Sequence, residues 1–202
     1  MNRNFQIALD DYLIHLEIER GLSDKTVLGY KFDLRVFGEY LDNYIFDNNW
    51  NLKDIKSRHI RSFLAYLKKE RKNSPEAMNR KIVVLHTFFR FLIRTGEYDI
   101  KKDPSKDFKK LKTEKKLPEY LSLAECEKLL DTISKVSNHP ERDLALYQLF
   151  LQTGCRISEV SSLKLVNLSF KEKYIKIRGK GNKERIIPLT NTTIDFLKEY
   201  IK

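Results

Sequence analysis

The stretch from Thr153 to Pro188 constrains the fold of this chain more than any other, because its pattern changes from helical to extended. Gly154 ends an apolar, helix-forming run, and a new helix is predicted to begin near Arg156. Alternating apolar residues then flank Gly179-Lys180-Gly181-Asn182, a turn-forming segment that is typical of a β-hairpin. The stretch therefore predicts a helix, a turn, a second helix and a hairpin with Lys180 at its tip.

Arg156 and Lys180 would place two cations on these elements, which suits a phosphate whose charge increases during a reaction. An arginine fork grips two phosphate oxygens, and a lysine on a tight turn can act as a point charge or as a proton donor. Glu159 lies one helical turn after Arg156 and can hold its guanidinium in place. From the residues alone, a structural Arg–Glu pair and a solvated turn lysine explain the pattern as well.

Helical periodicity without a strand pattern predicts a bundle of four helices over about residues 1–98. Gly21 and Gly96 are expected to end helices, whereas Ser23 and Ser74-Pro75 are expected to begin them. The apolar positions of the four helices are Phe5, Leu9, Tyr12, Leu13 and Leu16; Val27, Tyr30, Leu34, Phe37 and Leu41; Ile60, Phe63, Leu64 and Leu67; and Ile82, Leu85, Phe89 and Leu92.

Residues 99–119 are lysine-rich and poor in apolar side chains, which predicts a flexible linker between two domains. A basic linker can follow a phosphate backbone, or it can simply be soluble. After it, Ser122 and Glu125 have the spacing of a capping box that opens a helix. The run 141–153 is apolar on most faces, so we expect that helix to be buried.

The composition favours a polyanionic partner, because the 202 residues carry a formal net charge of +11. An apolar content of 41% is sufficient for a core, so wholesale disorder is not expected. Cys126 and Cys155 show no metal-ligand spacing and fit a reducing cytosol. Neither a signal segment nor a membrane-spanning run is found, so we expect a cytoplasmic protein without a membrane partner.

Thr153-Gly154-Cys155-Arg156-Ile157-Ser158-Glu159 and Gly179-Lys180-Gly181-Asn182-Lys183-Glu184-Arg185 resemble the first two catalytic motifs of the tyrosine recombinases, especially Xer-type recombinases and phage-type integrases. Residues 22–30, 79–81, 88–92 and 103–105 are similar to the core-binding domain of that family. The resemblance implies a mainly α fold. It comprises a four-helix, SAM-like, DNA-binding domain over 1–98, a linker over 99–119, and part of an α+β catalytic domain with a β-hairpin over 120–202.

The same resemblance implies that Arg156 is the first catalytic arginine, Lys180 the hairpin lysine and Glu159 a supporting acid. The chemistry that the resemblance implies is cleavage and rejoining of duplex DNA through a phosphotyrosine, without metal or cofactor. On the fourth helix Arg80 is the stronger candidate, because His86 lies beside aromatic residues and can equally be a half-buried, satisfied histidine. Ser23 can equally be an ordinary helix cap. The predicted DNA contacts are Ser23, Lys25, Thr26, Tyr30, Arg80, His86, Lys109, Lys110, Lys112, Lys183 and Arg185.

The family also requires a His-x-x-Arg motif, a further His or Trp, and the nucleophilic tyrosine. No histidine follows Arg156, and we assign neither Tyr174 nor Tyr200 as the nucleophile. The chain is expected to be truncated before these motifs, either as a fragment of a longer recombinase or as a naturally short protein. Both explanations predict DNA binding without cleavage by this chain alone. Homo-oligomers on DNA are expected of a full-length protein.

Two interpretations of other classes are compatible with the residues. A helical transcription regulator would bind duplex DNA without needing an Arg156–Lys180 cluster. A helical interaction module would need no nucleic acid at all, and the basic linker argues against it. The salt dependence and the footprint of duplex binding separate these classes.

Overall fold

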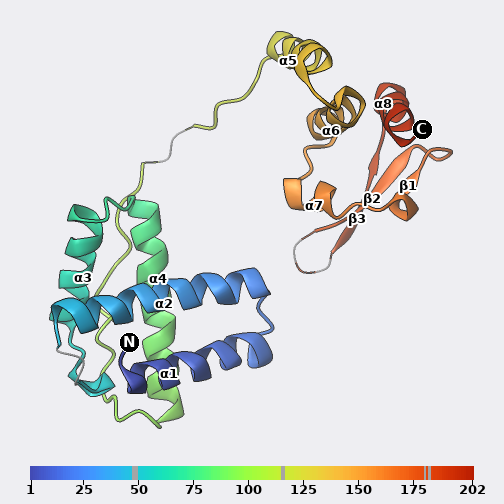
Figure 1. Cartoon of the computed structure of the whole chain (residues 1–202). Helices are drawn as coiled ribbons and strands as arrows, with labels where there is room; N and C mark the ends of the chain where they lie inside the picture. The colour runs from blue at the N-terminus through green and yellow to red at the C-terminus, as the bar shows by residue number, and fades with distance from the viewer. Residues whose placement is uncertain (47–49, 115–116, 180, 182) are drawn as a thin grey trace. The chain divides into compact units, whose positions relative to one another are not determined.

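The computed structural model describes residues 1–46, 50–114, 117–179, 181 and 183–202. It divides the chain into two compact units, Met1–Lys116 and Leu117–Lys202 (Figure 1). Each unit has a hydrophobic core of its own. The first unit is helical and the second combines helices with a small sheet, as the predicted fold class requires. The units are described separately below.

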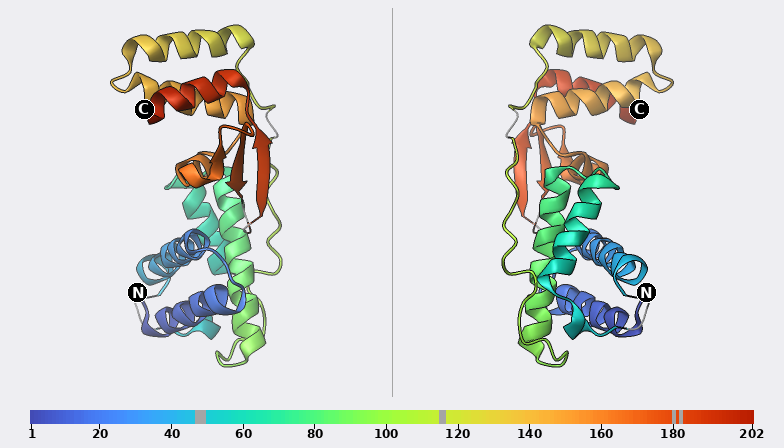
Figure 2. Two further views of the ribbon diagram at one scale, coloured as in Figure 1. Left: turned by 90° about the vertical axis from the view of Figure 1, so that its right-hand side faces the viewer. Right: turned by 90° about the vertical axis from the view of Figure 1, so that its left-hand side faces the viewer.

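The first unit is a helical bundle, as the periodicity of the sequence predicts. In it, α4 packs against α1, α2 and α3, and crosses α1 and α2 in the ribbon diagrams (Figures 1 and 2). Its helices are α1 (Arg3–Ile14), which continues into a π-helical turn (His15–Glu19), α2 (Asp24–Tyr44), a 3-10 turn (Leu52–Asp54), α3 (Ser57–Lys69) and α4 (Pro75–Thr95).

Capping residues set the ends of α4 as expected. The Ser74 hydroxyl accepts a hydrogen bond from the Ala77 amide at 3.3 Å, and Pro75 occupies the first turn. Gly96 adopts φ +72°, a left-handed conformation that glycine reaches without strain. At the start of α2 the Ser23 hydroxyl instead pairs with the Thr26 hydroxyl at 3.0 Å, and its side chain caps no backbone amide.

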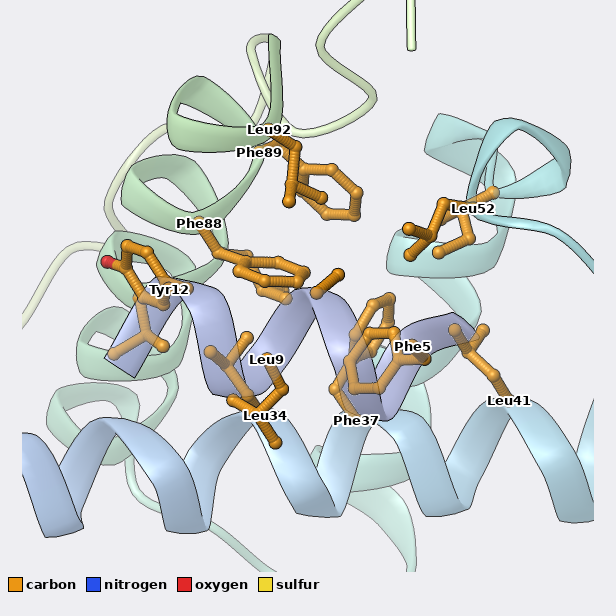
Figure 3. Close-up of a cluster of buried hydrophobic side chains, with 14 of the residues drawn as sticks. Phe5, Leu9, Tyr12, Leu34, Phe37, Leu41, Leu52, Phe88, Phe89 and Leu92 are labelled. Carbon is orange, nitrogen blue, oxygen red and sulfur yellow. The ribbon is translucent and has the colours of Figure 1, made fainter. Parts of the chain in front are cut away.

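The core of the first unit is aromatic (Figure 3). The ring of Phe5 makes edge contacts with Phe37 and Phe88, at centroid distances of 6.2 and 5.6 Å. Such edge-to-face pairs add stability beyond the area they bury. Trp50 also belongs to this core: it is buried, and its indole donates to Asp42 Oδ1 at 2.8 Å.

The segment after α4 packs on the bundle, although the sequence suggested a flexible linker from residue 99. Phe108 packs against the core, and Ser105 is buried. The side-chain amide of Asn79 donates to the Leu111 carbonyl at 3.0 Å and accepts from its amide at 2.6 Å. These contacts place the segment up to about residue 111 with the first unit.

The second unit contains the predicted hairpin. Strands β2 and β3 pair antiparallel, with Ile175 opposite Ile187 and Ile177 opposite Arg185, and β1 adds to the β2 edge. Its elements are α5 (Leu123–Val136), α6 (Pro140–Thr153), α7 (Ile157–Ser161), a 3-10 turn (Leu165–Asn167), β1 (Leu168–Ser169), β2 (Tyr174–Arg178), β3 (Glu184–Pro188) and α8 (Asn191–Ile201).

The capping box at the start of α5 is confirmed. The Ser122 amide donates to Glu125 Oε2 at 2.8 Å, and the Glu125 amide donates to the Ser122 hydroxyl at 3.3 Å.

The expectation that residues 141–153 form a helix buried on most faces is wrong. In α6 only Ala145 and Leu149 are buried, whereas Tyr147 and Leu151 are 41% and 40% exposed. The reason is that α6 packs mainly against α5 and α8, which cover only part of its surface. Within the described residues, no helix is long and apolar enough to cross a membrane.

Candidate functional site

Arg156 stands at the start of α7, where the chain leaves α6 through a left-handed glycine. Gly154 has φ +60° and ends α6, and Arg156 is the extended residue that caps α7. The Arg156 amide donates to Glu159 Oε2 at 2.8 Å, and its guanidinium Nη1 donates to Glu159 Oε1 at 3.1 Å. The three-residue spacing that sequence reasoning singled out therefore holds the arginine at both its backbone and its side chain.

Glu159 is the centre of this site. Its side chain is only 4% exposed, and Arg185 on β3 grips it with a fork: Nη1 lies 2.9 Å from Oε1, and Nη2 lies 2.9 Å from Oε2. The hydrogen bonds from Arg185, and next the one from the Arg156 amide, lower the pKa of Glu159 to about 2. The carboxylate is therefore ionised at neutral pH and has donors on both oxygens.

The two arginines differ in what they leave for a ligand. Arg156 is 74% exposed and Arg185 is 42% exposed. One buried negative charge faces two positive charges, so the cluster keeps a net charge of +1 by formal count. An exposed guanidinium in a fixed orientation is suited to bidentate recognition of a phosphate.

The hairpin comes close to this cluster at Gly179. A Cβ atom at Gly179 would lie 3.2 Å from Glu159 Oε1 and 3.3 Å from Arg185 Nη1, so a glycine permits the close approach. The Gly179 amide donates to the Lys183 carbonyl at 2.8 Å and closes the turn. Lys183 is exposed. The predicted catalytic Lys180 lies outside the described residues, and its neighbour Gly179 adjoins Glu159.

In the first unit the structure builds a second shared carboxylate, which sequence reasoning missed. Asp33 Oδ1 accepts from Arg80 Nη2 at 2.9 Å and from Lys81 Nζ at 2.5 Å. Asp33 and Lys81 are 1% and 7% exposed, whereas Arg80 is 56% exposed. A Cβ at Gly29 would lie 3.4 Å from Arg80 Nη1, an ordinary contact. The buried Asp33 therefore fixes the Arg80 guanidinium, which remains accessible to solvent on the surface formed by α2 and α4.

The other predicted DNA contacts of α2 lie near its beginning. Ser23, Lys25 and Thr26 lie around the first turn, where free amides and the helix dipole favour an anion. Tyr30 is half-buried, and its ring centroid lies 6.3 Å from that of the buried Tyr12. The structure thus gives Tyr30 a packing role, whereas the other three side chains are accessible.

His86 has protein partners on both ring nitrogens. Nε2 lies 2.9 Å from the Phe108 carbonyl and Nδ1 lies 3.0 Å from the Ser105 hydroxyl. The histidine therefore fastens the segment after α4, and this geometry favours a satisfied, half-buried histidine over a DNA contact. Further along the segment, the predicted DNA contacts are exposed: Lys109, Lys110 and Lys112.

In the part of the chain that the structure describes, no group of three or more His, Cys, Asp or Glu side chains is arranged to hold a metal ion. Cys126 and Cys155 are both free. Cys155 is buried next to Arg156, and its sulfur lies 3.8 Å from Arg185 Nη2.

Comparisons with known proteins agree with this architecture in both units. Residues 119–202 match the phage integrase family, and residues 9–96 match the phage integrase N-terminal SAM-like domain. The chain therefore belongs to the phage integrase family of tyrosine recombinases, and the resemblance of its motifs to that family is confirmed.

Among individual relatives, the chain is similar to the tyrosine recombinases XerD of Oceanobacillus iheyensis and Listeria innocua. It is 35% identical to the former over 196 residues and 34% identical to the latter over 197 residues, which is 97% and 96% of this chain. The chain spans 64% of the length of each of these relatives.

Solved structures share the fold. A lambda integrase tetramer bound to a Holliday junction superposes with a TM-score of 0.73 at 21% identity, over 96% of this chain and 54% of the other. The Tn1549 transposon integrase in complex with circular intermediate DNA gives a TM-score of 0.68 at 19% identity, over 96% of this chain and 64% of the other.

Proposed function

We propose that this chain binds duplex DNA with both units and supplies the first part of the catalytic centre of a Xer-like site-specific recombinase. The observation that carries this proposal is the exposed guanidinium of Arg156, held by the buried carboxylate of Glu159 beside the hairpin. In this function Arg156 binds a phosphate of the DNA backbone, and Lys180 acts on the same phosphate from the hairpin.

The charge of the molecule supports a nucleic-acid partner. A formal net charge of +11 attracts a polyanion, and binding releases counterions from the phosphates. Exposed cations are available in the first unit at Lys25 and Arg80, and in the second at Arg156 and Lys183. Lambda integrase, with which the chain shares its fold, was solved on DNA as a dimer and as a tetramer. We therefore extend the proposal to oligomers on DNA, acting in the cytoplasm.

The proposed chemistry follows from the two cations. When a nucleophile attacks a phosphodiester, negative charge grows on the phosphate oxygens, and a preorganised arginine stabilises it without reorganising. A lysine at the hairpin tip can protonate the departing sugar oxygen. The four histidines of the chain are His15, His59, His86 and His139, so none follows Arg156. We propose that these 202 residues bind their site without cleaving it.

Duplex binding against salt tests the proposal. A duplex is first selected by the purified chain from a random pool, and its affinity is then measured over a range of salt concentrations. We expect a steep salt dependence and an extended footprint, and Arg156→Gln should weaken contact at one central phosphate. A compact palindromic footprint that is indifferent to Arg156 would favour a transcription regulator, and an absence of binding would refute a role on DNA.

A nicked suicide duplex that contains the selected site tests the absence of cleavage. We expect no covalent protein–DNA adduct with this chain. An adduct through Tyr200 would contradict the proposal, because it would show that this chain cleaves a DNA strand by itself.

A further inference from the structure

We propose that Arg185 is a positioning residue: it ties the hairpin to the start of α7 and sets the orientation of Arg156, and it does not itself contact DNA. The inference rests on the proposed function and adds a role to a residue that the sequence pattern assigned to DNA. Three observations in the second unit support it. Both oxygens of Glu159 are saturated, Arg185 lies on the inner face of the hairpin, and Gly179 lies close to Glu159 and Arg185.

Both carboxylate oxygens of Glu159 are saturated, and the fork of Arg185 occupies one acceptor position on each. Each carboxylate oxygen accepts one nitrogen of Arg185 at 2.9 Å, and each also accepts one donor of Arg156, at 2.8 Å on Oε2 and 3.1 Å on Oε1. For Glu159 to turn and take Arg156 as a bidentate partner, it would have to break the fork. Arg185 therefore leaves Arg156 with a single side-chain bond to Glu159, and the rest of its guanidinium is available for a phosphate.

The facing of Arg185 agrees with this role. Arg185 is directly opposite Ile177, which is 1% exposed, and residues directly opposite each other in a sheet share a face. That face packs against α7, because Glu159 of α7 accepts both nitrogens of the Arg185 fork and Val160 of α7 packs against the cluster that contains Ile177. The same hairpin carries an exposed ion pair, Lys176 to Glu184, with 2.6 Å between Nζ and Oε2. Arg185 thus extends from β3 toward Glu159, and the predicted tip of the hairpin comes earlier in the chain, at Lys180.

Gly179 brings the hairpin against the cluster. The space beside its α-carbon is occupied by the two partners of the fork, so a Cβ placed there would lie only 3.2 Å from Glu159 Oε1 and 3.3 Å from Arg185 Nη1. Contacts of that length require the side chains to give by a few tenths of an ångström. Gly179→Ala is therefore a variant that disturbs the fork while it removes no charge.

The substitution Arg185→Lys distinguishes a positioning role of Arg185 from a direct contact between its charge and a phosphate. Lysine keeps the positive charge, but its single nitrogen cannot form the two parallel N–H···O bonds that Nη1 and Nη2 of Arg185 make to Glu159. If Arg185 were a phosphate contact, Arg185→Lys would keep most of the affinity, and Arg185→Gln would reduce the salt slope by about 1. If Arg185 positions Arg156, both substitutions should remove the contribution of Arg156.

The test uses the selected duplex with one neutral methylphosphonate at a time. One position should weaken binding of the wild-type chain by about tenfold and have no effect in Arg156→Gln, which identifies the phosphate bound by Arg156. We expect the effect at that position to be lost in Arg185→Lys and Arg185→Gln and reduced in Gly179→Ala. The matched control is Lys176→Gln, which removes a cation from the exposed pair of the same hairpin and should keep the full effect.

A DNA-free readout keeps this inference separate from the proposed function. The Arg156 Nε–H resonance in ¹H–¹⁵N spectra should shift in Arg185→Lys and Gly179→Ala and stay in place in Lys176→Gln, while the backbone amide spectrum shows that the second unit is folded. An unchanged Arg156 resonance, or a methylphosphonate effect retained in Arg185→Lys, overturns the positioning role. Failure of the wild-type chain to bind any duplex overturns the proposed function instead.

Discussion

In each unit a buried carboxylate binds one exposed arginine and a second cation, but the two carboxylates differ in how many of their oxygens accept hydrogen bonds. Asp33 accepts both of its partners, Arg80 and Lys81, on Oδ1, and Oδ2 is buried with no hydrogen-bond partner among the described residues. Glu159 instead has donors on both oxygens. A fully satisfied carboxylate specifies the direction of its arginine more tightly than one bound through a single atom.

The surroundings of the two carboxylates differ as well. Asp33 lies in a helical bundle with a large aromatic core, and its partner Lys81 is buried with it. Glu159 lies in a unit with a smaller core, where both of its partners reach solvent. The comparison indicates that Asp33 mainly affects the stability of the bundle, whereas Glu159 mainly affects the geometry of the site.

The largest effect is expected at Asp33. Asp33→Asn leaves Lys81 buried without a counter-charge, so the first unit should lose about 3 kcal/mol of unfolding free energy. Chemical denaturation of the whole chain, followed by the fluorescence of the buried Trp50, measures it. The double variant with Lys81→Met should recover most of the loss, because it removes the unpaired charge and keeps the volume. Wild-type stability in Asp33→Asn would contradict the comparison.

A pH dependence is expected at Glu159. Its folded pKa is lowered to about 2 from an ordinary value of 4.5, chiefly by the hydrogen bonds of Arg185. A lowered carboxylate pKa contributes stability that is present above about pH 4.5 and is lost as the pH falls toward 2. The melting temperature of the second unit should therefore exceed that of Glu159→Gln at pH 7, and the two should converge on acidification. A constant difference across this range would show that ionisation of Glu159 does not stabilise the unit.

A smaller effect on stability is expected at His86, which binds the lysine-rich segment after α4. His86→Phe keeps an aromatic ring but removes the partner of the Phe108 carbonyl and one of the two partners of the buried Ser105 hydroxyl, which keeps its bond to Asp103; this should cost about 1 kcal/mol. Faster hydrogen exchange or proteolysis near Lys109 would report the opening. Duplex affinity should change little, and a loss as large as that of Arg156→Gln would return His86 to the DNA contacts.

The smallest effect on stability is expected at Arg80. The Arg80 side chain is 56% exposed in its ion pair with Asp33, so Arg80→Gln should change the free energy of unfolding by less than about 1 kcal/mol. If Arg80 binds a phosphate, the slope of affinity against salt should fall by about 1. Equal slopes for the variant and the wild type would remove Arg80 from the interface.

Local sequence patterns predicted the helix ends and the Arg156–Glu159 pair. Contacts between residues far apart in the sequence could not be predicted in this way. The capping box of α5, the end of α4 at Gly96 and the Arg156–Glu159 pair are all encoded within one helical turn, so the sequence indicates them directly. The Asp33–Lys81 pair joins residues 48 positions apart, and no local signal indicated it.

Arg185 is an instructive case of an available signal that was not used. It alternates with Ile187 and Leu189, which are half-buried and buried, so the two-residue period of the strand already placed it on the inner face. The prediction that α6 is buried was wrong for a different reason. Its apolar residues predict a covered helix, but the neighbours α5 and α8 cover only part of its surface.

A structure of the chain on its selected duplex tests the central claim most directly. We predict that Arg156 lies about 2.7–2.9 Å from an oxygen of one backbone phosphate, with the fork of Arg185 on Glu159 intact. An Arg156 guanidinium turned away from the DNA, with Arg185 released from Glu159 and bound to phosphate in its place, would contradict the account.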